Sequence, residues 1–300
     1  MEFKDIFVKR YFRVTDKVNQ LIKVDVVKRN LSKAKISLLA DISKSYADHF
    51  IRNDRNFRED QLQKILSIFD VSFNFKNFIP VDTTQGKFIS FPRKSSPESM
   101  QIIGYFLGDG TAQPKTVRFK DTARDVLEIY QDLVRKVFAI NGRIVPQTGT
   151  RAYLLEVNSV CLSKWLRENI VLRKKDFLRE VSRLPKRQLS AFLRGLFDAE
   201  GCVAIQSRQI RLGITNREIG KILPALISKL AIPLTSLFIK RRESSWKDVY
   251  LVSLNSYASF DKFSEYIGFS SKEKRKRLEF LVHREPKTKL MNKFNLCAGL

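Results

Sequence analysis

Two stretches of the chain carry a helical apolar pattern and end in the same way, with an acidic residue followed by glycine. The two stretches are IIGYFLGDG, residues 102–110, and LRGLFDAEG, residues 193–201. Gly104 and Gly108 stand four apart in the first, and Gly195 and Ala199 hold the same places in the second. Residues four apart share one helix face, and small side chains there let two backbones approach closely. The pattern therefore predicts two helices that pack against each other.

The pattern after each stretch is also repeated. Alternating apolar and polar positions in TVRFKD predict a half-buried strand, ARDVLEIYQDLVRKVF predicts a helix, and two strands follow across a turn at Gly149. The second copy keeps this order, and YLLEVNS at 153–159 matches YLVSLNS at 250–256. We therefore expect an α+β fold of two αββαββα units with antiparallel sheets, related by a pseudo-two-fold axis. The units are residues 98–190 and 191–300, the second with a basic C-terminal tail.

The segment before these units reads as a small helical domain over residues 1–80, followed by a linker over 81–97. Leu62, Ile65, Leu66 and Phe69 fall on one helix face. Upstream, KISLLADISKSYADHFIRN predicts two short helices with a break near residues 41–43. This pattern resembles a helix-turn-helix, although no glycine stands in the turn. A helical bundle that packs on the main units is the alternative.

The charge of the chain indicates its class of partner. The net charge is +25, an excess that favours a polyanion such as nucleic acid. No apolar run approaches the ~20 residues of a membrane span, and the N-terminus has no signal-peptide core. Cys161, Cys202 and Cys297 lack zinc-site spacing, and the chain has only 2 histidines. We therefore expect an intracellular protein (cytoplasmic, nucleoid or organellar), not secreted, in which oxygen ligands bind any metal.

The two acidic residues stand at a place where carboxylates are unfavourable. If Gly110 and Gly201 end the helices in a left-handed conformation, Asp109 and Glu200 lie at two adjacent helix C-termini. The helix dipole disfavours a negative charge there by about 0.3–1 kcal/mol. Bound divalent cations would relieve this cost, and carboxylates that hold such ions recur in phosphodiester hydrolysis.

The two motifs resemble the paired signature of the LAGLIDADG homing endonucleases, over about residues 98–285. The letters that match are Gly104, Asp109 and Gly110 in the first copy, and Leu193, Gly195, Asp198, Ala199, Glu200 and Gly201 in the second. The resemblance implies a monomer that cuts both strands of a long asymmetric DNA site across the minor groove, leaving short 3′ overhangs. It implies Mg²⁺ or Mn²⁺ held by Asp109 and Glu200, with the carbonyls of Gly108 and Ala199.

The family also places a basic residue beside each acid. Lys175 and Lys272 take equivalent positions in the two copies, which makes them the candidates. Both lie in lysine-rich stretches, so a solvated basic loop is the alternative. The stretch RLPKRQLSAFLRGLFDAEG is similar to endonuclease domains found inside inteins, but residue 1 is not a splicing nucleophile and the chain does not end in His-Asn. We expect a freestanding or intron-encoded endonuclease, or a piece excised from something larger.

Polar residues on the predicted strands are the candidates for reading DNA, because a two-stranded ribbon fits the major groove. These candidates are Arg118, Lys120, Gln147 and Arg151 in the first unit, and Gln206, Arg208, Arg211, Lys240 and Arg242 in the second. Each could equally contact a phosphate. The basic run over residues 272–289 is expected to bind phosphates and to make the affinity depend on salt.

Two other functions remain open on the sequence. One is a catalytically inactive DNA-binding regulator of the same fold, which the loss of either acid would have favoured. The other is an RNA-splicing maturase. Both acids are present, so we expect a divalent-metal-dependent DNA endonuclease.

Overall fold

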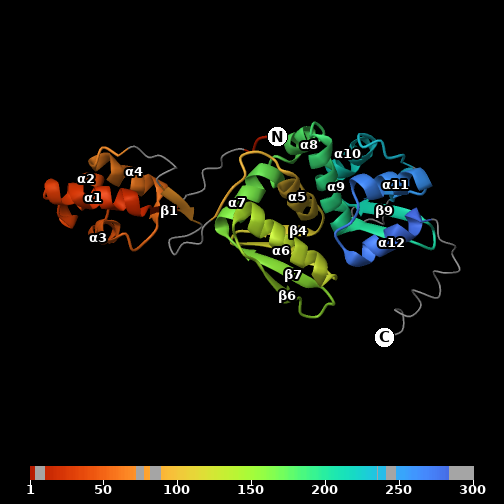
Figure 1. The fold of residues 1–300 in the computed structure, drawn as a ribbon, viewed down its shortest axis with the longest axis horizontal. Coiled ribbons are helices and arrows are strands. Elements are labelled where there is room, and N and C mark those ends of the chain that lie inside the picture. The colour runs from red at the N-terminus through yellow and green to blue at the C-terminus, as the bar shows by residue number, and fades with distance from the viewer. Residues whose placement is uncertain (4–10, 72–77, 82–88, 235, 241–247, 284–300) are drawn as a thin grey trace.

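The computed structural model describes residues 1–3, 11–71, 78–81, 89–234, 236–240 and 248–283. Within them, no helix is long and apolar enough to cross a membrane. The N-terminal domain lies at one end of the molecule, and the two repeats form the body (Figure 1). The elements of this domain are β1 (Tyr11–Val14), α1 (Asp16–Lys28), α2 (Lys33–Ala40), α3 (Lys44–Arg52), β2 (Phe57–Arg58), α4 (Glu59–Ile68) and β3 (Phe78–Val81).

The body contains the two repeats that the sequence predicts. The first comprises α5 (Pro97–Asp109), β4 (Gly110–Gln113), β5 (Thr116–Asp121), α6 (Arg124–Phe138), β6 (Arg143–Pro146), β7 (Tyr153–Asn158), α7 (Val160–Leu166), η2 (Arg167–Val171) and α8 (Lys174–Val181). The second comprises α9 (Lys186–Glu200), β8 (Gly201–Ala204), β9 (Gln209–Ile214), α10 (Arg217–Ser228), β10 (Ser236–Lys240), β11 (Val249–Leu254), α11 (Tyr257–Tyr266) and α12 (Lys272–Val282).

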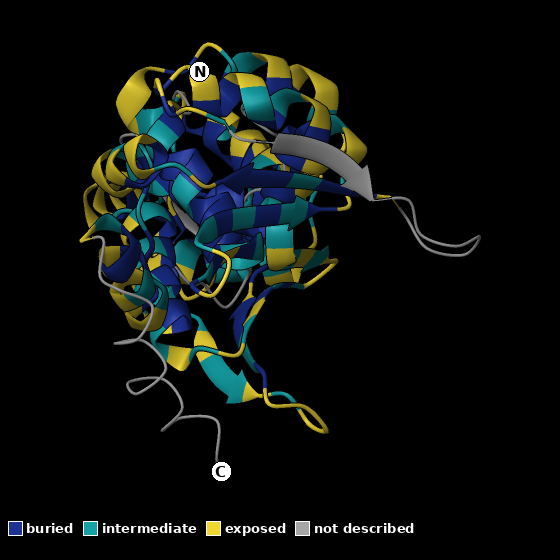
Figure 2. Cartoon of the chain, turned by 90° about the vertical axis from the view of Figure 1, so that its right-hand side faces the viewer, coloured by how far each residue is buried: buried dark blue, intermediate teal, exposed yellow. Residues whose placement is uncertain are grey.

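The two sheets share one topology. The first has strand order β4-β5-β7-β6, and the second has the equivalent order β8-β9-β11-β10. Every pairing in both sheets is antiparallel. The buried core is continuous across both repeats, and outer helices show exposed residues on one side and buried residues on the other (Figure 2). The predicted two-unit α+β fold is therefore confirmed.

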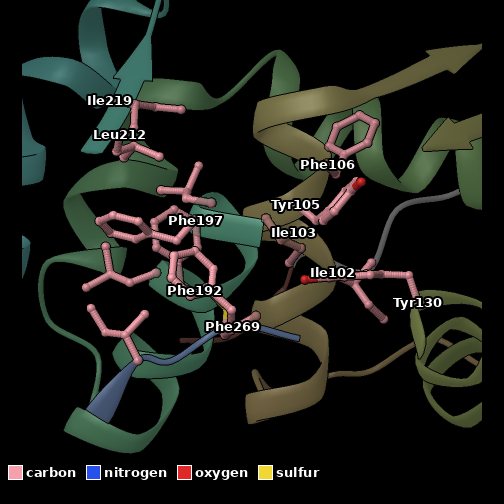
Figure 3. Packing of buried hydrophobic residues seen from close by; sticks show 14 of the residues in the cluster. Ile102, Ile103, Tyr105, Phe106, Tyr130, Phe192, Phe197, Leu212, Ile219 and Phe269 are labelled. Carbon is pink, nitrogen blue, oxygen red and sulfur yellow. The ribbon is translucent and has the colours of Figure 1, made fainter. Parts of the chain in front are cut away.

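The motif helices α5 and α9 pack backbone to backbone at the centre of the body. A Cβ on Gly104 would lie 2.1 Å from the carbonyl oxygen of Phe192, and a Cβ on Gly195 would lie 2.2 Å from that of Gln101. Only glycine fits at either place. With the glycines between the helices, the large side chains point outward, so that Tyr105 of α5 and Phe197 of α9 lie on opposite sides of the crossing (Figure 3).

The glycine that follows each helix has a different role from the one predicted. Gly110 has φ −97° and ψ 149°, and Gly201 has φ −85° and ψ 148°. Both are extended, so the prediction of a left-handed helix end is wrong. Each helix passes directly into a strand, and a Cβ would lie 2.5 Å from the Phe106 carbonyl oxygen at Gly110 and 2.4 Å from that of Phe197 at Gly201. Lack of space, rather than the sign of φ, requires glycine here.

The N-terminal domain differs from the predicted segment in two respects. Besides its helices it contains a three-stranded antiparallel sheet of order β2-β1-β3. Residues 1–3, moreover, lie against the body. The Phe3 N–H donates to the carbonyl oxygen of Arg93 at 3.0 Å, the Ser95 N–H donates to that of Met1 at 3.0 Å, and the ring of Phe3 packs on Trp165. The chain therefore starts on the body, forms the domain and returns to the body.

Candidate active site

Asp109 and Glu200 stand side by side because they end the two helices that pack most closely. A Cβ on Gly108 would lie 2.6 Å from the Cβ of Ala199 and 3.1 Å from the Cγ of Glu200. Asp109 is exposed and Glu200 half-buried, so solvent and ligands can reach both carboxylates. The structure therefore brings the two acids and the two small residues before them to one place.

The surroundings of the two carboxylates favour their protonated forms. Desolvation raises the pKa of Asp109, although the residue is exposed, and the charge of Asp121 adds to that rise. Desolvation, together with the charge of Asp109, raises the pKa of Glu200 to about 7. Lys274 opposes both shifts, and Lys120 opposes the shift of Asp109. Because ionising both carboxylates places two negative charges beside each other, a cation bound between them would stabilise the ionised forms.

Lys274 contacts the end of α9 directly. Its Nζ donates to the carbonyl oxygen of Asp198 at 2.6 Å and to that of Phe197 at 3.4 Å. A lysine at a helix C-terminus satisfies carbonyls that lack partners within the helix and opposes the negative end of the dipole. Its ammonium group also lies 5.7 Å from the centre of the Phe269 ring.

A buried polar network fixes the segment that carries Lys274. Asp198 is completely buried and accepts hydrogen bonds from the Tyr130 hydroxyl at 2.8 Å and from the Ser270 N–H at 2.7 Å. Gln101 donates to the Ser270 hydroxyl at 3.0 Å. These bonds join α5, α6 and α9 to the residues just before α12. Asp198 was recognised as the sixth motif letter, but the sequence did not reveal these partners.

The predicted lysines lie elsewhere. Lys175 is in the first turn of α8. Lys272 is the first residue of α12, and its N–H donates to Asp125 of α6 at 3.2 Å. The cations that act on the acid pair are Lys274 and Lys120 instead. The structure therefore places Lys274, rather than Lys272, against the end of α9, and Lys175 and Lys272 stay predictions.

The donor set at the two helix ends fits a hard divalent cation. The described residues contain no group of three or more His, Cys, Asp or Glu side chains that could hold a metal, so further ligands would be backbone carbonyls, water and substrate oxygens. Mg²⁺ accepts one or two carboxylates and retains several waters. Cys161 is buried and Cys202 exposed; Cys297 lies outside the described residues.

A row of charged side chains crosses the first sheet on the face opposite its helices. Arg118 of β5, Glu156 of β7 and Arg143 of β6 are in register. Glu156 is 8% exposed, and its two oxygens accept from Arg118 at 3.0 Å and from Arg143 at 2.9 Å. The buried carboxylate thus orients two arginines on one face. The sequence did not reveal Arg143, because the four residues RIVP are too few for an apolar–polar alternation to assign a face.

The other candidates of the first repeat surround this row. Lys120, two positions after Arg118, is exposed on the same face of β5. Gln147 and Arg151 flank the turn between β6 and β7, where the Gln147 N–H donates to the carbonyl oxygen of Ala152 at 2.8 Å. Arg151 is exposed. These three residues therefore lie at the strand surface and its tip.

The second sheet places its candidates differently. Arg211 lies on the outward face of β9 and donates to Gln209 at 2.5 Å and to Ser207 at 3.0 Å. Gln206 and Arg208 lie in the turn between β8 and β9 rather than on a strand, and Arg208 has φ 49° and donates to the Tyr257 hydroxyl at 2.7 Å. The prediction that they are strand residues is wrong, because alternation was extended through the turn.

The remaining candidates are only partly described. Lys240 is the last residue of β10, where it pairs with Val249. Arg242 lies outside the described residues, as does the part of the basic run beyond residue 283. The described part of that run forms α12, in which Lys272, Arg275 and Lys276 are exposed.

The raised pKa of Glu200 predicts how the metal-free protein responds to pH. The folded protein keeps a proton on Glu200 up to about pH 7, whereas the unfolded chain releases it near pH 4.5. This contribution to the free energy of unfolding is complete below the unfolded pKa and is lost as pH rises through 7.

In EDTA, Glu200→Gln should therefore raise the Tm at pH 8 by a few degrees and have little effect at pH 4.5. Thermal melts of the two proteins across this range, with exposed Glu279→Gln as the control, measure this. An equal difference at both pH values would contradict it.

Comparison with protein families adds an independent observation. Residues 96–171 and 187–268 match the LAGLIDADG-like domain, so the two matches coincide with the two repeats.

Among solved structures, the fold is similar to that of I-DmoI, a homing endonuclease solved with DNA and Mn. The sequence identity is 18% and the TM-score is 0.43, over 57% of this chain and 96% of that one. I-DmoI has also been solved with Mg and with Ca. Full-length DUF199/WhiA from Thermatoga maritima is similar at 13% identity and a TM-score of 0.45, over 68% of each chain.

Similar segments also occur within proteins of unrelated functions. The chain is 31% identical over 292 residues to the glutamine–fructose-6-phosphate aminotransferase of Methanocaldococcus jannaschii, covering 95% of this chain and 26% of that protein. It is 26% identical over 268 residues to a probable translation initiation factor IF-2 of Thermococcus kodakarensis, covering 83% of this chain and 22% of that protein. The chain therefore spans about a quarter of the length of these relatives.

Proposed function

Because this chain belongs to the LAGLIDADG family, we propose that it is a site-specific double-strand DNA endonuclease that depends on a divalent metal. The observation that carries the proposal is the pair of carboxylates, Asp109 and Glu200, at the ends of two glycine-packed helices. Their pKa values are raised, so a cation between them would relieve the cost of two adjacent like charges.

Each residue of the site has a role in this proposal. Asp109 and Glu200 would hold the metal, with the carbonyls of Gly108 and Ala199 as further donors. When bound there, Mg²⁺ or Mn²⁺ supplies Lewis-acid chemistry for phosphodiester hydrolysis. Lys274 holds a positive charge at the end of α9, where it favours the ionised carboxylates and would oppose negative charge that develops on a nearby phosphate.

The two sheets provide the surface for recognition. Arg118 and Arg143 are held in place by Glu156, so they present their guanidinium groups at little cost in side-chain entropy. Arginine pairs with guanine through two hydrogen bonds. In the second sheet Ser253 takes the place of Glu156, so the two halves differ chemically. A monomer with two unlike halves fits an asymmetric duplex site.

The distribution of relatives is consistent with a mobile element. Segments similar to this chain make up about a quarter or less of an aminotransferase, an initiation factor, a replicative helicase and an ATP synthase subunit. These proteins have no common activity. A shared piece is therefore best explained as an insertion with its own function, and DNA cleavage is a function that promotes insertion.

The proposal is tested by selection of cleaved sites. A pooled library of DNA duplexes is incubated with the protein in Mg²⁺ and in EDTA, and the cut ends are sequenced. We expect one recoverable site cut on both strands only in Mg²⁺. Binding to a specific site without any cutting would favour a catalytically inactive regulator, and specific binding to a structured intron RNA would favour a maturase.

Lys274 and Lys272 can be separated by matched substitutions. Lys274→Met removes the cation that lowers the pKa of Glu200 and of Asp109. The cleavage rate should fall roughly a hundredfold, and the pH at which half of the maximal rate is reached should rise. Lys272→Met, two positions away, should leave both quantities near those of the wild type. Equal effects of the two substitutions on the cleavage rate would rule out the role of Lys274.

A further inference from the structure

The N-terminal domain contains two short helices whose connection is fixed by specific contacts. α2 ends at Ala40, and Asp41 follows with a left-handed backbone, φ 48° and ψ 57°. The Ser37 hydroxyl donates to the carbonyl oxygen of Ile42 at 2.6 Å, and the Ser43 side chain accepts from the Tyr46 N–H at the start of α3. Asp41 thus supplies the left-handed residue for which glycine is common. A connection this short between two capped helices is that of a helix-turn-helix.

The inner faces of both helices belong to a core separate from that of the body. Ile36 of α2 and Ala47 of α3 are completely buried, and Phe50 is 1% exposed. The Phe50 ring packs on Phe57 at 5.5 Å and on Phe69 at 6.2 Å between centroids. These residues form one cluster with α4 and α1. α3 is therefore held by its inner face, and its outer face remains accessible.

The outer face of α3 carries only polar groups. Lys44, Ser45 and Arg52 are exposed, and Asp48 between them is half-buried; their spacing places all four on one side of the helix. The Asp48 carboxylate pairs with Arg52 and, at 3.4 Å, with the Nζ of Lys33 at the start of α2. This face therefore combines donors and an acceptor, and nothing in the body is needed to hold it in place.

We propose that α3 is a DNA-recognition helix and that this chain reads a second DNA block next to the one bound by the two repeats. In a helix-turn-helix the second helix enters the major groove with its N-terminal residues at the base edges, while the first helix crosses the backbone. Lys44 and Ser45 are placed for the bases, and Lys33 is placed for a phosphate. Asp48 accepts from a cytosine amino group and disfavours other bases. A carboxylate on this face would repel a bare polyanion but can accept a hydrogen bond from a base edge, so duplex DNA fits better.

The experiment uses the full chain in a Glu200→Gln background, where binding is measured apart from cutting, and therefore does not rest on the proposed nuclease activity. Bound duplexes are selected from a random library long enough for both blocks and are sequenced. Lys44→Ala/Arg52→Ala is compared with Lys17→Ala/Lys23→Ala, which removes the same charge from exposed positions of α1. A third variant, Ser45→Arg, tests base recognition by adding a longer side chain to α3 instead of removing one.

We expect two separate blocks in the parent. The α3 double variant should lose the sequence preference of one block and about tenfold or more in affinity, whereas the α1 control should keep both blocks. Ser45→Arg should change the preferred bases at one or two positions, which a misfolded domain would not do. Identical blocks and affinities for all variants would overturn the proposal. If the blocks behave as expected but the wild type cuts no DNA, only the nuclease proposal fails.

Discussion

Glu200→Gln is expected to slow double-strand cleavage by roughly a thousandfold or more and to leave DNA affinity almost unchanged. Glutamine keeps the shape of the side chain but removes the charge that, in our proposal, would hold the metal. A metal stabilises the transition state by several kcal/mol, and each 1.36 kcal/mol corresponds to a tenfold rate. Affinity should be unchanged or slightly higher, because a negative charge near the phosphates is lost. Asp109→Asn should behave in the same way.

The measurement is a single-turnover cleavage assay on the selected site, with binding followed separately on the same duplex. Glu279→Gln, which removes a carboxylate from the exposed side of α12, is the matched control and should cut normally. If Glu200→Gln cut at the rate of the wild type, the acid pair would not be the metal site, and the raised pKa of Glu200 would have another cause.

Gly104→Ala is expected to destabilise the body by about 3 kcal/mol or more, although alanine is the better helix former. The helix propensity of alanine favours the substitution by about 1 kcal/mol. The added methyl group, however, would lie 2.1 Å from the Phe192 carbonyl oxygen and 3.1 Å from the Leu196 nitrogen. Both are backbone atoms that cannot rotate away, so α5 and α9 must separate, and overpacking of this kind costs about 1–3 kcal/mol, occasionally more.

Chemical denaturation measures this loss, and a second position provides the control. At Gly108 the new methyl group would meet the Cβ of Ala199 at 2.6 Å, which is a side-chain atom. Gly108→Ala alone should destabilise the body, whereas the double variant Gly108→Ala/Ala199→Gly moves one methyl group across the crossing and should recover most of the stability. If Gly104→Ala were as stable as the wild type, the close packing of the helices would not be required.

The repeated elements could be predicted because local pattern and duplication agree. The apolar stripe of each motif helix, the alternation of TVRFKD and the matching letters around residues 153 and 250 all specify the same unit. The acid pair could be recognised for the same reason. The two carboxylates stand at equivalent places in the two copies, so the packing of the copies brings them together.

Lys274, the lysine that contacts the end of α9, could not be identified in this way. Equivalence between the copies pointed to Lys272, but Lys274 is selected by the phase of α12. Residues two apart on a helix do not share a face, and the anchoring of the helix start by Asp198 and Asp125 sets that phase. Those contacts join residues about 70 and 150 positions apart in sequence. Likewise, the extended backbone of Gly110 goes with its pairing to Phe119 of β5, which a motif alone does not reveal.

The attachment of the N-terminal domain at both of its ends has a consequence for how such a protein could arise. Residues 1–3 and 93–95 are hydrogen-bonded neighbours on the body. The chain therefore leaves the body and returns to it at adjacent points, and the domain between them could be gained or lost as a unit without changing the fold of the two repeats. Exchange of this domain would then change the proposed second DNA block and leave the path of the chain through the two repeats unchanged.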